Sequence, residues 1–206
     1  MLPFFDRPDT KWRDLKGCLH FYLVPSIDDP VRDDFGQMVA SLHGLPGVGV
    51  QPVQYMHVTV QRLNAYIPDR HLPAFADFEQ SLQSVFASIP SFELSFSKPE
   101  IRREAVEAIS NPNQSWEQIV GILRSELMAA GLTDFLEAIP FAPHYSLAYG
   151  TKHSDDALTA AALEFVAKST SFWVNKVHLV AVDQDPESGI FSFQTLREWE
   201  LKSQSE

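Results

Sequence analysis

The feature that most constrains the fold is a regular alternation of short apolar runs with amphipathic segments, which occurs twice along the 206 residues. Apolar residues at every second position predict strands, and apolar residues at three- and four-residue steps predict helices. In the first half, the pattern predicts strands at 17–24, 53–63 and 91–97, helices at 29–42 and 69–89, and a Gly/Pro-rich loop at 43–52. This order of elements is typical of a mixed α+β chain.

The second half repeats this order. Residues 101–109 fit a strand or a helix, and we assign a strand because a strand followed by a helix would match the first half. The remaining elements are a helix at 112–130 with Gly131 as its C-cap, a strand centred on 144–148, a short helix at 154–168, and a terminal hairpin of 172–182 and 190–201 joined by a 183–189 loop.

These elements predict an α+β fold of two pseudo-symmetric β-α-β lobes, with mainly antiparallel sheets flanking a central cleft. We expect one bilobal domain over residues 1–206, with intertwined lobes and approximate halves at 1–97 and 98–206. The apolar content of 45%, including 15 Phe, is sufficient for a large core. We expect the protein to be a monomer.

The charge and the cysteine content restrict the partners and the compartment. With 27 acidic and 16 basic side chains, the net charge is −11. This charge keeps a protein soluble and opposes binding of long duplex nucleic acid, so a nucleic-acid ligand should be a short piece or a chain end. No apolar run is long enough to span a membrane, and no secretory signal is recognisable at residues 1–6. A single cysteine, Cys18, fits a reducing compartment, so we expect a cytoplasmic protein without membrane partners.

Two of the predicted strands carry the same pattern, His57-Val-Thr59-Val and His144-Tyr-Ser146-Leu. Side chains alternate between the two faces of a strand, so His57 shares a face with Thr59, and His144 shares a face with Ser146. Each strand therefore offers an imidazole beside a hydroxyl. Because the two motifs occupy equivalent places in their halves, a pseudo-twofold arrangement would bring both faces to one cleft.

This set of groups suits displacement at a phosphodiester. One group must take a proton from the nucleophile and another must protonate the leaving oxygen, and histidine, with a pKa near ~6.5, can do either. Hydroxyls can donate hydrogen bonds to the non-bridging oxygens. The scheme requires no metal or cofactor, and the sequence contains no His-x-x-x-His, no cysteine cluster, no phosphate-binding Gly-rich loop and no Gly-x-Ser-x-Gly.

The paired motifs, the second led by Phe-Ala-Pro, resemble those of the two-histidine (2H) phosphoesterases. This superfamily includes the 2′-5′ RNA ligase-like proteins and the 2′,3′-cyclic nucleotide phosphodiesterases. The resemblance covers the chain from the first strand to the terminal hairpin and implies two α+β lobes around a water-filled cleft. It also implies that His57 and His144 are the catalytic pair and that Thr59 and Ser146 bind the phosphate.

The chain departs from this family after the second motif. Several members carry a basic residue there, whereas this chain has Ala-Tyr-Gly at 148–150, and Arg62 near the first motif is the candidate substitute. Tyr55 and Gln61 share the face of His57 if that strand is regular, so both are candidate cleft-lining residues. Tyr55 would either pack in the interior or stack on a base.

We therefore predict a metal-independent phosphodiesterase that hydrolyses a 2′,3′-cyclic phosphate or a 2′-5′-linked short RNA or nucleotide. The pattern leaves open which histidine is the acid and whether hydrolysis or ligation is favoured. The alternatives are a non-catalytic nucleotide- or RNA-end-binding module with the same cleft, and a structural protein whose imidazoles lie far apart. The other histidines are expected to be packed, edge, loop or helix-start residues: His20, His43, His71, His153 and His178.

Overall fold

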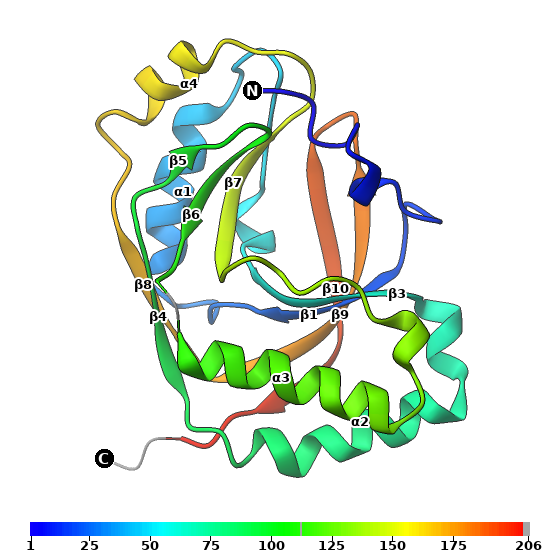
Figure 1. Ribbon diagram of the computed structural model, residues 1–206. Coiled ribbons are helices and arrows are strands. Elements are labelled where there is room, and N and C mark those ends of the chain that lie inside the picture. Colours follow the sequence, from blue (N-terminus) through cyan, green and yellow to red (C-terminus); the bar gives the residue numbers. More distant parts are fainter. Residues whose placement is uncertain (112, 204–206) are drawn as a thin grey trace.

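The computed structural model describes residues 1–111 and 113–203 and contains helices and strands in alternation (Figure 1). The helices are α1 (Val31–Leu42), α2 (Pro73–Phe86), α3 (Gln114–Ala129) and α4 (Asp156–Leu163). The strands are β1 (Cys18–Leu23), β2 (Val48–Val50), β3 (Val58–Tyr66), β4 (Phe92–Phe96), β5 (Glu100–Ile101), β6 (Ala105–Ile109), β7 (His144–Gly150), β8 (Thr170–Val174), β9 (Lys176–Asp185) and β10 (Ile190–Glu200).

The strands form two sheets of four and a separate pair. One sheet has the order β10-β9-β1-β3, the other has the order β2-β7-β6-β5, and β4 pairs with β8. Every pair of neighbouring strands in these sheets is antiparallel, which confirms the predicted α+β class. The sheets mix the two sequence halves, because β9 and β10 join β1 and β3, while β2 joins β7.

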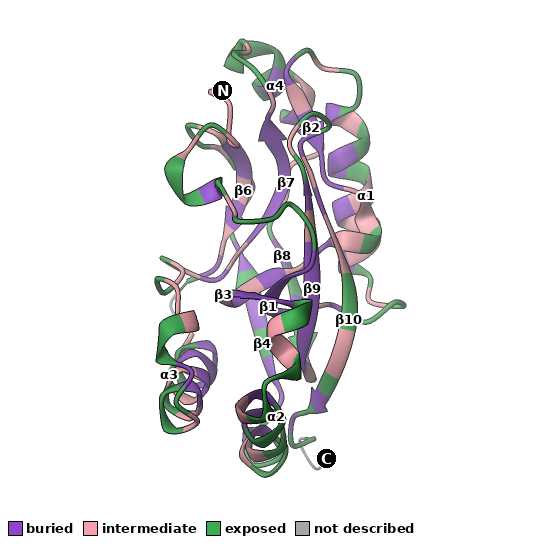
Figure 2. Ribbon diagram, turned by 90° about the vertical axis from the view of Figure 1, so that its right-hand side faces the viewer, coloured by how far each residue is buried: buried purple, intermediate pink, exposed green. Residues whose placement is uncertain are grey.

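The helices cover the outer faces of the two sheets. In Figure 1, α2 and α3 lie along the sheet that contains β1 and β3, whereas α1 and α4 lie beside the sheet that contains β7. Figure 2 shows the buried residues on the helix faces that turn toward the strands. In α1 these residues recur at helical spacing: Val31, Phe35, Met38, Val39 and Leu42. No helix in the described part of the chain is long and apolar enough to cross a membrane.

A second, smaller apolar cluster lies apart from this main core. Strands β1, β7, β9 and β10 contribute Tyr22, Tyr149, Val182 and Phe191 to it, and segments before β1 add Phe4, Phe5 and Trp12. The N-terminal segment is tied to the second sheet, since Leu2 N donates to the Arg103 carbonyl and Phe4 N donates to the Gly150 carbonyl, both over 2.8 Å. This segment therefore packs over the region between the two sheets.

Several predicted boundaries differ from the structure for local reasons. The predicted 69–89 helix is interrupted at Leu72, which is extended (φ −62°, ψ 132°) because the following Pro73 disfavours a helical conformation before it. Leu72 is consequently 45% exposed. The predicted 53–63 strand begins only at Val58, since Val53–Tyr55 form a 3-10 turn after Pro52.

Other predictions are confirmed with changes in length. Residues 101–109 do form strand structure, as parts of β5 and β6, and Gly131 ends α3 with a φ of +73°. The predicted 43–52 loop contains β2, the 154–168 helix is shorter, and the 172–182 strand divides into β8 and β9. Pro112, the predicted start of the third helix, lies outside the described residues.

Candidate active site

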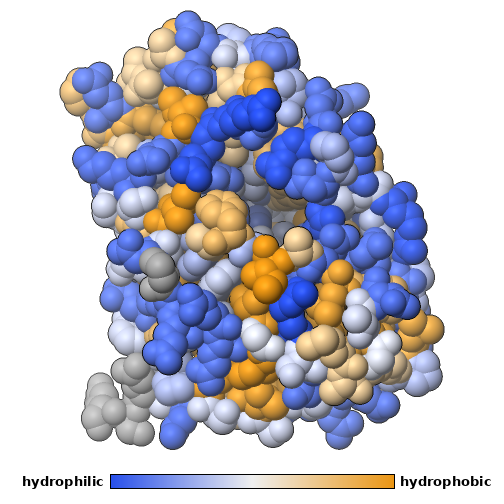
Figure 3. All heavy atoms as spheres, viewed as in Figure 1, coloured by the Kyte–Doolittle hydropathy of each residue, from blue (hydrophilic) through white to orange (hydrophobic). Residues whose placement is uncertain are grey.

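A cavity of about 240 Å³ contains both histidines and both hydroxyls of the sequence motifs. In Figure 3 the surface is hollowed near the centre of the face that Figure 1 presents. The motif residues on its wall are His57, Thr59, His144 and Ser146. The other lining residues come from the N-terminal segment, from β1, β3, β6, β7, β9 and β10, and from the loop before β7: Phe4, Arg7, Asp9, Thr10, Trp12, His20, Tyr22, Arg62, Glu107, Pro140, Phe141, Tyr149, Gln184 and Phe191.

The two motif histidines make the same hydrogen bond. Nδ1 of His57 lies 2.7 Å from the Tyr55 carbonyl oxygen, and Nδ1 of His144 lies 2.9 Å from the Ala142 carbonyl oxygen. A carbonyl oxygen only accepts hydrogen bonds, so each Nδ1 carries the hydrogen and donates it. In the neutral ring this arrangement leaves Nε2 with a free lone pair, which is the state that a proton acceptor needs.

Each imidazole also stacks on an aromatic ring. His57 stacks on Tyr22 with ring centroids 4.0 Å apart and planes inclined by 14°. His144 stacks on Phe141 with centroids 4.8 Å apart and planes inclined by 21°. Together with the Nδ1 hydrogen bond, each stacking contact fixes the orientation of the ring.

Each motif hydroxyl has a tyrosine phenol beside it. The Tyr22 hydroxyl lies near Thr59, and the Tyr149 hydroxyl lies near Ser146. Burial raises the pKa of both tyrosines well above the ordinary value of 10, so each phenol keeps its proton. A protonated phenol can donate to the threonine or serine oxygen, which frees that hydroxyl to donate elsewhere.

The surroundings of His57 favour its neutral form. Burial is the largest effect and lowers the pKa of His57 from 6.5 to about 4, while the Tyr55 carbonyl opposes this shift and the nearby His144 adds to it. His57 is therefore neutral at neutral pH. Both imidazoles also line the same cavity, which excludes the alternative in which they lie far apart.

The positive and negative side chains that line the cavity are equal in number. Arg7 and Arg62 are matched by Asp9 and Glu107. Arg62 Nη1 donates to the Asp9 carbonyl over 2.6 Å, and its Nη2 lies 3.3 Å from a Glu137 carboxylate oxygen. Arg62, which lies on the same strand as Thr59, therefore adds a positive charge to the groups that the two motifs supply.

A β-bulge explains why Arg62, and not Gln61, reaches the cavity. In the β1–β3 pairing, Tyr22 lies opposite Thr59 and Phe21 lies opposite Gln61, which leaves Val60 without a counterpart and reverses the alternation. Gln61 is fully buried, and its amide nitrogen donates to the Arg62 and Glu137 carbonyls. The expectation that a regular strand would bring Gln61 into the cleft therefore does not hold.

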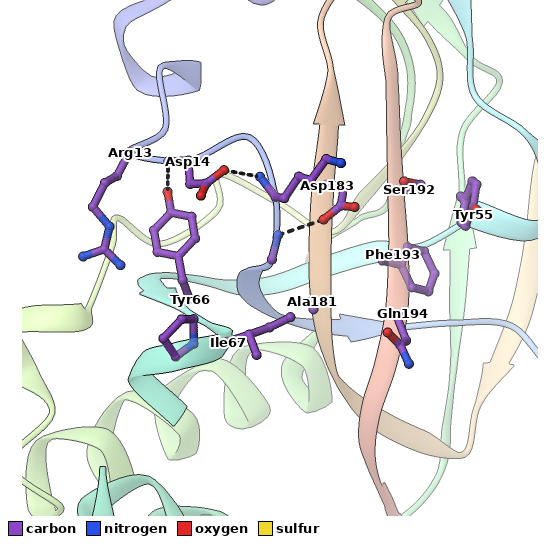
Figure 4. A pocket seen from close by; sticks show the side chains of 13 residues that line it. Arg13, Asp14, Tyr55, Tyr66, Ile67, Ala181, Asp183, Ser192, Phe193 and Gln194 are labelled. Carbon is purple, nitrogen blue, oxygen red and sulfur yellow. Dashed lines mark hydrogen bonds between the residues drawn. The ribbon is translucent and has the colours of Figure 1, made fainter. Parts of the chain in front are cut away.

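Tyr55 also lies outside this cavity. The 3-10 turn before β3 directs it toward a second cavity of about 700 Å³, which it lines with residues of β9, β10 and the segment before β1 (Figure 4). Figure 4 shows the hydrogen bonds that shape this region, such as Gly17 N to the Asp183 carboxylate over 2.8 Å. The residues that line it include no histidine.

The sequence patterns did not predict which residues of distant segments line the cavity. The N-terminal segment brings Arg7 and Trp12 to the cavity, and its place depends on pairing with residues about a hundred or more positions away. His20 was expected to be a packed or edge residue, and it is indeed buried, but it also lines the cavity. His20 and Tyr22 are two residues apart on β1 and therefore share a face of the strand, and this spacing was the signal that could have identified His20 as a cavity residue.

The donor set does not resemble a metal centre. Among the described residues, no three His, Cys, Asp or Glu side chains are grouped as metal ligands would be. Cys18 is buried, and burial raises its pKa to about 12, so it is unsuited to act as a nucleophile.

Several solved structures share the fold of this chain. The fold is similar to the crystal structure of TT0787 of Thermus thermophilus, with a TM-score of 0.67 at 14% identity over 91% of this chain and 100% of that chain. It is similar to E. coli LigT complexed with 3′-AMP, with a TM-score of 0.60 at 21% identity over 90% of this chain and 98% of that chain. It is also similar to the MHV ns2 PDE domain, with a TM-score of 0.54 at 12% identity over 81% of this chain and 99% of that chain.

At these identities the structural likeness establishes the fold alone, and no curated protein sequence matches the chain. The sequence of residues 50–186, about two thirds of the chain, matches the 2'-5' RNA ligase superfamily, and this segment contains both histidine motifs. The chain therefore belongs to the 2'-5' RNA ligase superfamily, whose members are 2H phosphoesterases.

Proposed function

We propose that this protein is a metal-independent phosphodiesterase that hydrolyses a 2′,3′-cyclic phosphate or a 2′-5′-linked short RNA or nucleotide. The observation that carries the proposal is that two imidazoles with the same Nδ1 hydrogen bond line one cavity with two hydroxyls. The 3′-AMP complex of LigT supports a nucleotide as ligand.

His57 is suited to be the base of this reaction because it is neutral at neutral pH. Its Nε2 would take a proton from water as the water oxygen bonds to phosphorus. Protonated His144 would give its Nε2 proton to the 2′- or 3′-oxygen as the bond from phosphorus to that oxygen breaks, leaving a phosphate monoester.

The negative charge on the non-bridging oxygens would be stabilised by Thr59 and Ser146. Their oxygens can accept from the phenols of Tyr22 and Tyr149, so both hydroxyl hydrogens can point to the phosphoryl group. Arg62, which lies on the same strand as Thr59, adds a positive charge to the cavity wall.

The size and charge of the site favour a small substrate. The cavity, at about 240 Å³, is smaller than the roughly 300–1,000 Å³ of sites for drug-sized ligands. A balanced cavity on a chain of net charge −11 has little attraction for a long polyanion. A cyclic mononucleotide or a short RNA end meets both conditions.

The test is the hydrolysis of 2′,3′-cyclic mononucleotides by His57→Ala and His144→Ala. Each substitution should lower kcat/KM by about 10²- to 10⁴-fold, the usual effect of losing a general acid or base. His43→Ala, at an exposed position outside the cavity, is the matched control and should keep full activity. Activity should persist in a chelator. Wild-type rates in either cavity variant, or complete loss of activity in the chelator, would rule the mechanism out.

One observation favours a non-catalytic nucleotide- or RNA-end-binding module as the alternative. Both cavity arginines already have acceptors, since Arg7 pairs with the Asp9 carboxylate at 2.6 Å and Arg62 donates to the Asp9 carbonyl. Saturable nucleotide binding without turnover would support this alternative, whereas a bell-shaped pH–rate profile would support the enzyme.

A further inference from the structure

One end of the cavity contains polar groups that the catalytic scheme does not use. The side-chain amide of Gln184 has no hydrogen-bond partner among the described residues, at either its nitrogen or its oxygen, and neither does the indole nitrogen of Trp12. Gln184 is only 6% exposed, and both residues line the cavity. Buried polar side chains in folded proteins are nearly always paired, so these groups are available to a ligand.

The two groups lie around the same aromatic residue. Gln184 on β9 is the register partner of Phe191 on β10, and its backbone N–H donates to the Leu15 carbonyl over 2.7 Å. The backbone of Gln184 is thus fixed while its amide remains unpaired. The Trp12 ring lies 5.7 Å from the Phe191 ring and 5.2 Å from the His20 ring.

Trp12 also borders the phosphate end of the cavity. The guanidinium of Arg62 lies over its ring at 5.8 Å, and Arg62 belongs to the same strand as Thr59. A ligand whose phosphate lies between the two histidines could therefore extend along Trp12 toward Gln184. Aromatic and planar groups line this route, which suits a flat heterocycle.

We infer that Gln184 and Trp12 form a subsite for the hydrogen-bonding edge of a nucleobase, and that this base is a pyrimidine. The inference rests on the proposed function, because it names a further part of the substrate in the same cavity. The indole offers one donor, and the amide offers one donor and one acceptor. The matching edge must therefore present two acceptors and one donor.

On the pairing edge, which lies farthest from the sugar and enters such a subsite first, pyrimidines meet this requirement and purines do not. Uracil presents two carbonyl oxygens that flank an N–H, and cytosine presents a carbonyl oxygen, a ring nitrogen acceptor and an amino donor. The amide of Gln184 can turn over to suit either order. The pairing edge of guanine has two donors and one acceptor, and that of adenine has one of each, so a purine that enters with this edge leaves the indole N–H without an acceptor. A site with unmatched buried groups discriminates strongly against such a ligand.

Two substitutions remove the recognising groups and keep the shape of the cavity. Gln184→Met retains the length of the side chain, and Trp12→Phe retains an aromatic ring without the N–H. Because the Gln184 amide has no partner among the described residues, Gln184→Met should leave the melting temperature unchanged or higher. Gln51 is the matched control, since it is also buried but exchanges hydrogen bonds with the Phe191 backbone, so Gln51→Met should lower the melting temperature.

The experiment compares kcat/KM for the four 2′,3′-cyclic mononucleotides. The wild-type protein should favour the uridine and cytidine substrates by about tenfold or more. The ratio of kcat/KM for pyrimidine to purine substrates should fall toward one in Gln184→Met and in Trp12→Phe. Turnover of all four substrates at equal efficiency, or a preference that both variants keep, would overturn the pyrimidine subsite and leave the phosphodiesterase intact.

A binding measurement separates the two proposals. Calorimetric titration with 3′-UMP, 3′-CMP, 3′-AMP and 3′-GMP reports base preference without turnover. Pyrimidine-selective binding that Gln184→Met abolishes, in a protein that hydrolyses none of the cyclic nucleotides, would support the subsite and overturn the phosphodiesterase. Absence of binding and of turnover with every nucleotide would overturn both.

Discussion

The burial of His20 beside the cavity predicts a specific weakness of the fold toward acid. His20 is 4% exposed on β1, and its pKa is lowered from 6.5 to about 3. Burial is the largest cause, and the charge of Arg62 acts in the same direction. The Cys18 carbonyl, 3.3 Å from Nδ1, opposes the shift.

The sign and size of the effect follow from proton binding. Below the ordinary pKa of 6.5, the unfolded chain binds a proton at His20 that the folded chain does not bind until near pH 3. The free energy of unfolding therefore falls as the pH falls through this window. Each pH unit is worth about 1.36 kcal/mol, so at about pH 4.5 the loss is about 3 kcal/mol, a large part of a typical ~5–15 kcal/mol.

The assay is urea unfolding of the wild-type protein and of His20→Phe at about pH 7 and about pH 4.5. Phenylalanine keeps a ring against Trp12 and Tyr22, which lie 5.2 Å and 5.4 Å from the imidazole, but cannot titrate. The wild-type protein should lose about 3 kcal/mol more than the variant on acidification. Replacement of exposed His43 by Gln should leave the wild-type pH dependence unchanged. Equal losses in the wild-type protein and His20→Phe would refute the reasoning.

Two further predictions concern the walls of the site. Tyr22→Phe and Tyr149→Phe each remove the phenol hydroxyl that lies beside a motif hydroxyl, so each should lower kcat by about tenfold with little change in KM. Steady-state kinetics on a cyclic mononucleotide measures this effect, and full kcat in both variants would contradict it. Gly150→Ala places a Cβ against the Leu2 carbonyl oxygen, so it should displace the N-terminal segment and weaken nucleotide binding. Limited proteolysis near Arg7 and calorimetry check this expectation against Gly121→Ala, where a Cβ has open space, and equal results for the two variants would count against it.

The sequence identified what is local and missed what depends on pairing between distant segments. The two histidine motifs were recognisable because each occupies four consecutive residues. The bulge at Val60 was not, since it arises from the register between β1 and β3. The break at Leu72 was predictable in principle from Pro73, because proline restricts the residue before it whatever the tertiary context.

Long-range contacts account for the rest of the site. Gln184 carries no signal in its own segment, and its place in the cavity becomes apparent only when β10 places Phe191 opposite it and the N-terminal segment adds Trp12. The N-terminal segment in turn is held by the Gly150 carbonyl, which lies at the end of the strand that bears His144. The residues that line this cavity therefore cannot be identified from their positions along the chain.

The two motifs are alike in sequence, yet their surroundings differ in a way that bears on the proposed reaction. His57 stacks on Tyr22, which is 2% exposed, whereas His144 stacks on Phe141, which is 64% exposed. The protonated form of an imidazole is costly where water is excluded and less so beside an exposed ring. In the proposed reaction, the drier wall would therefore favour His57 as the base, and His144 would be the acid. Two equivalent motifs would then take opposite roles because of the aromatic residue on which each ring rests.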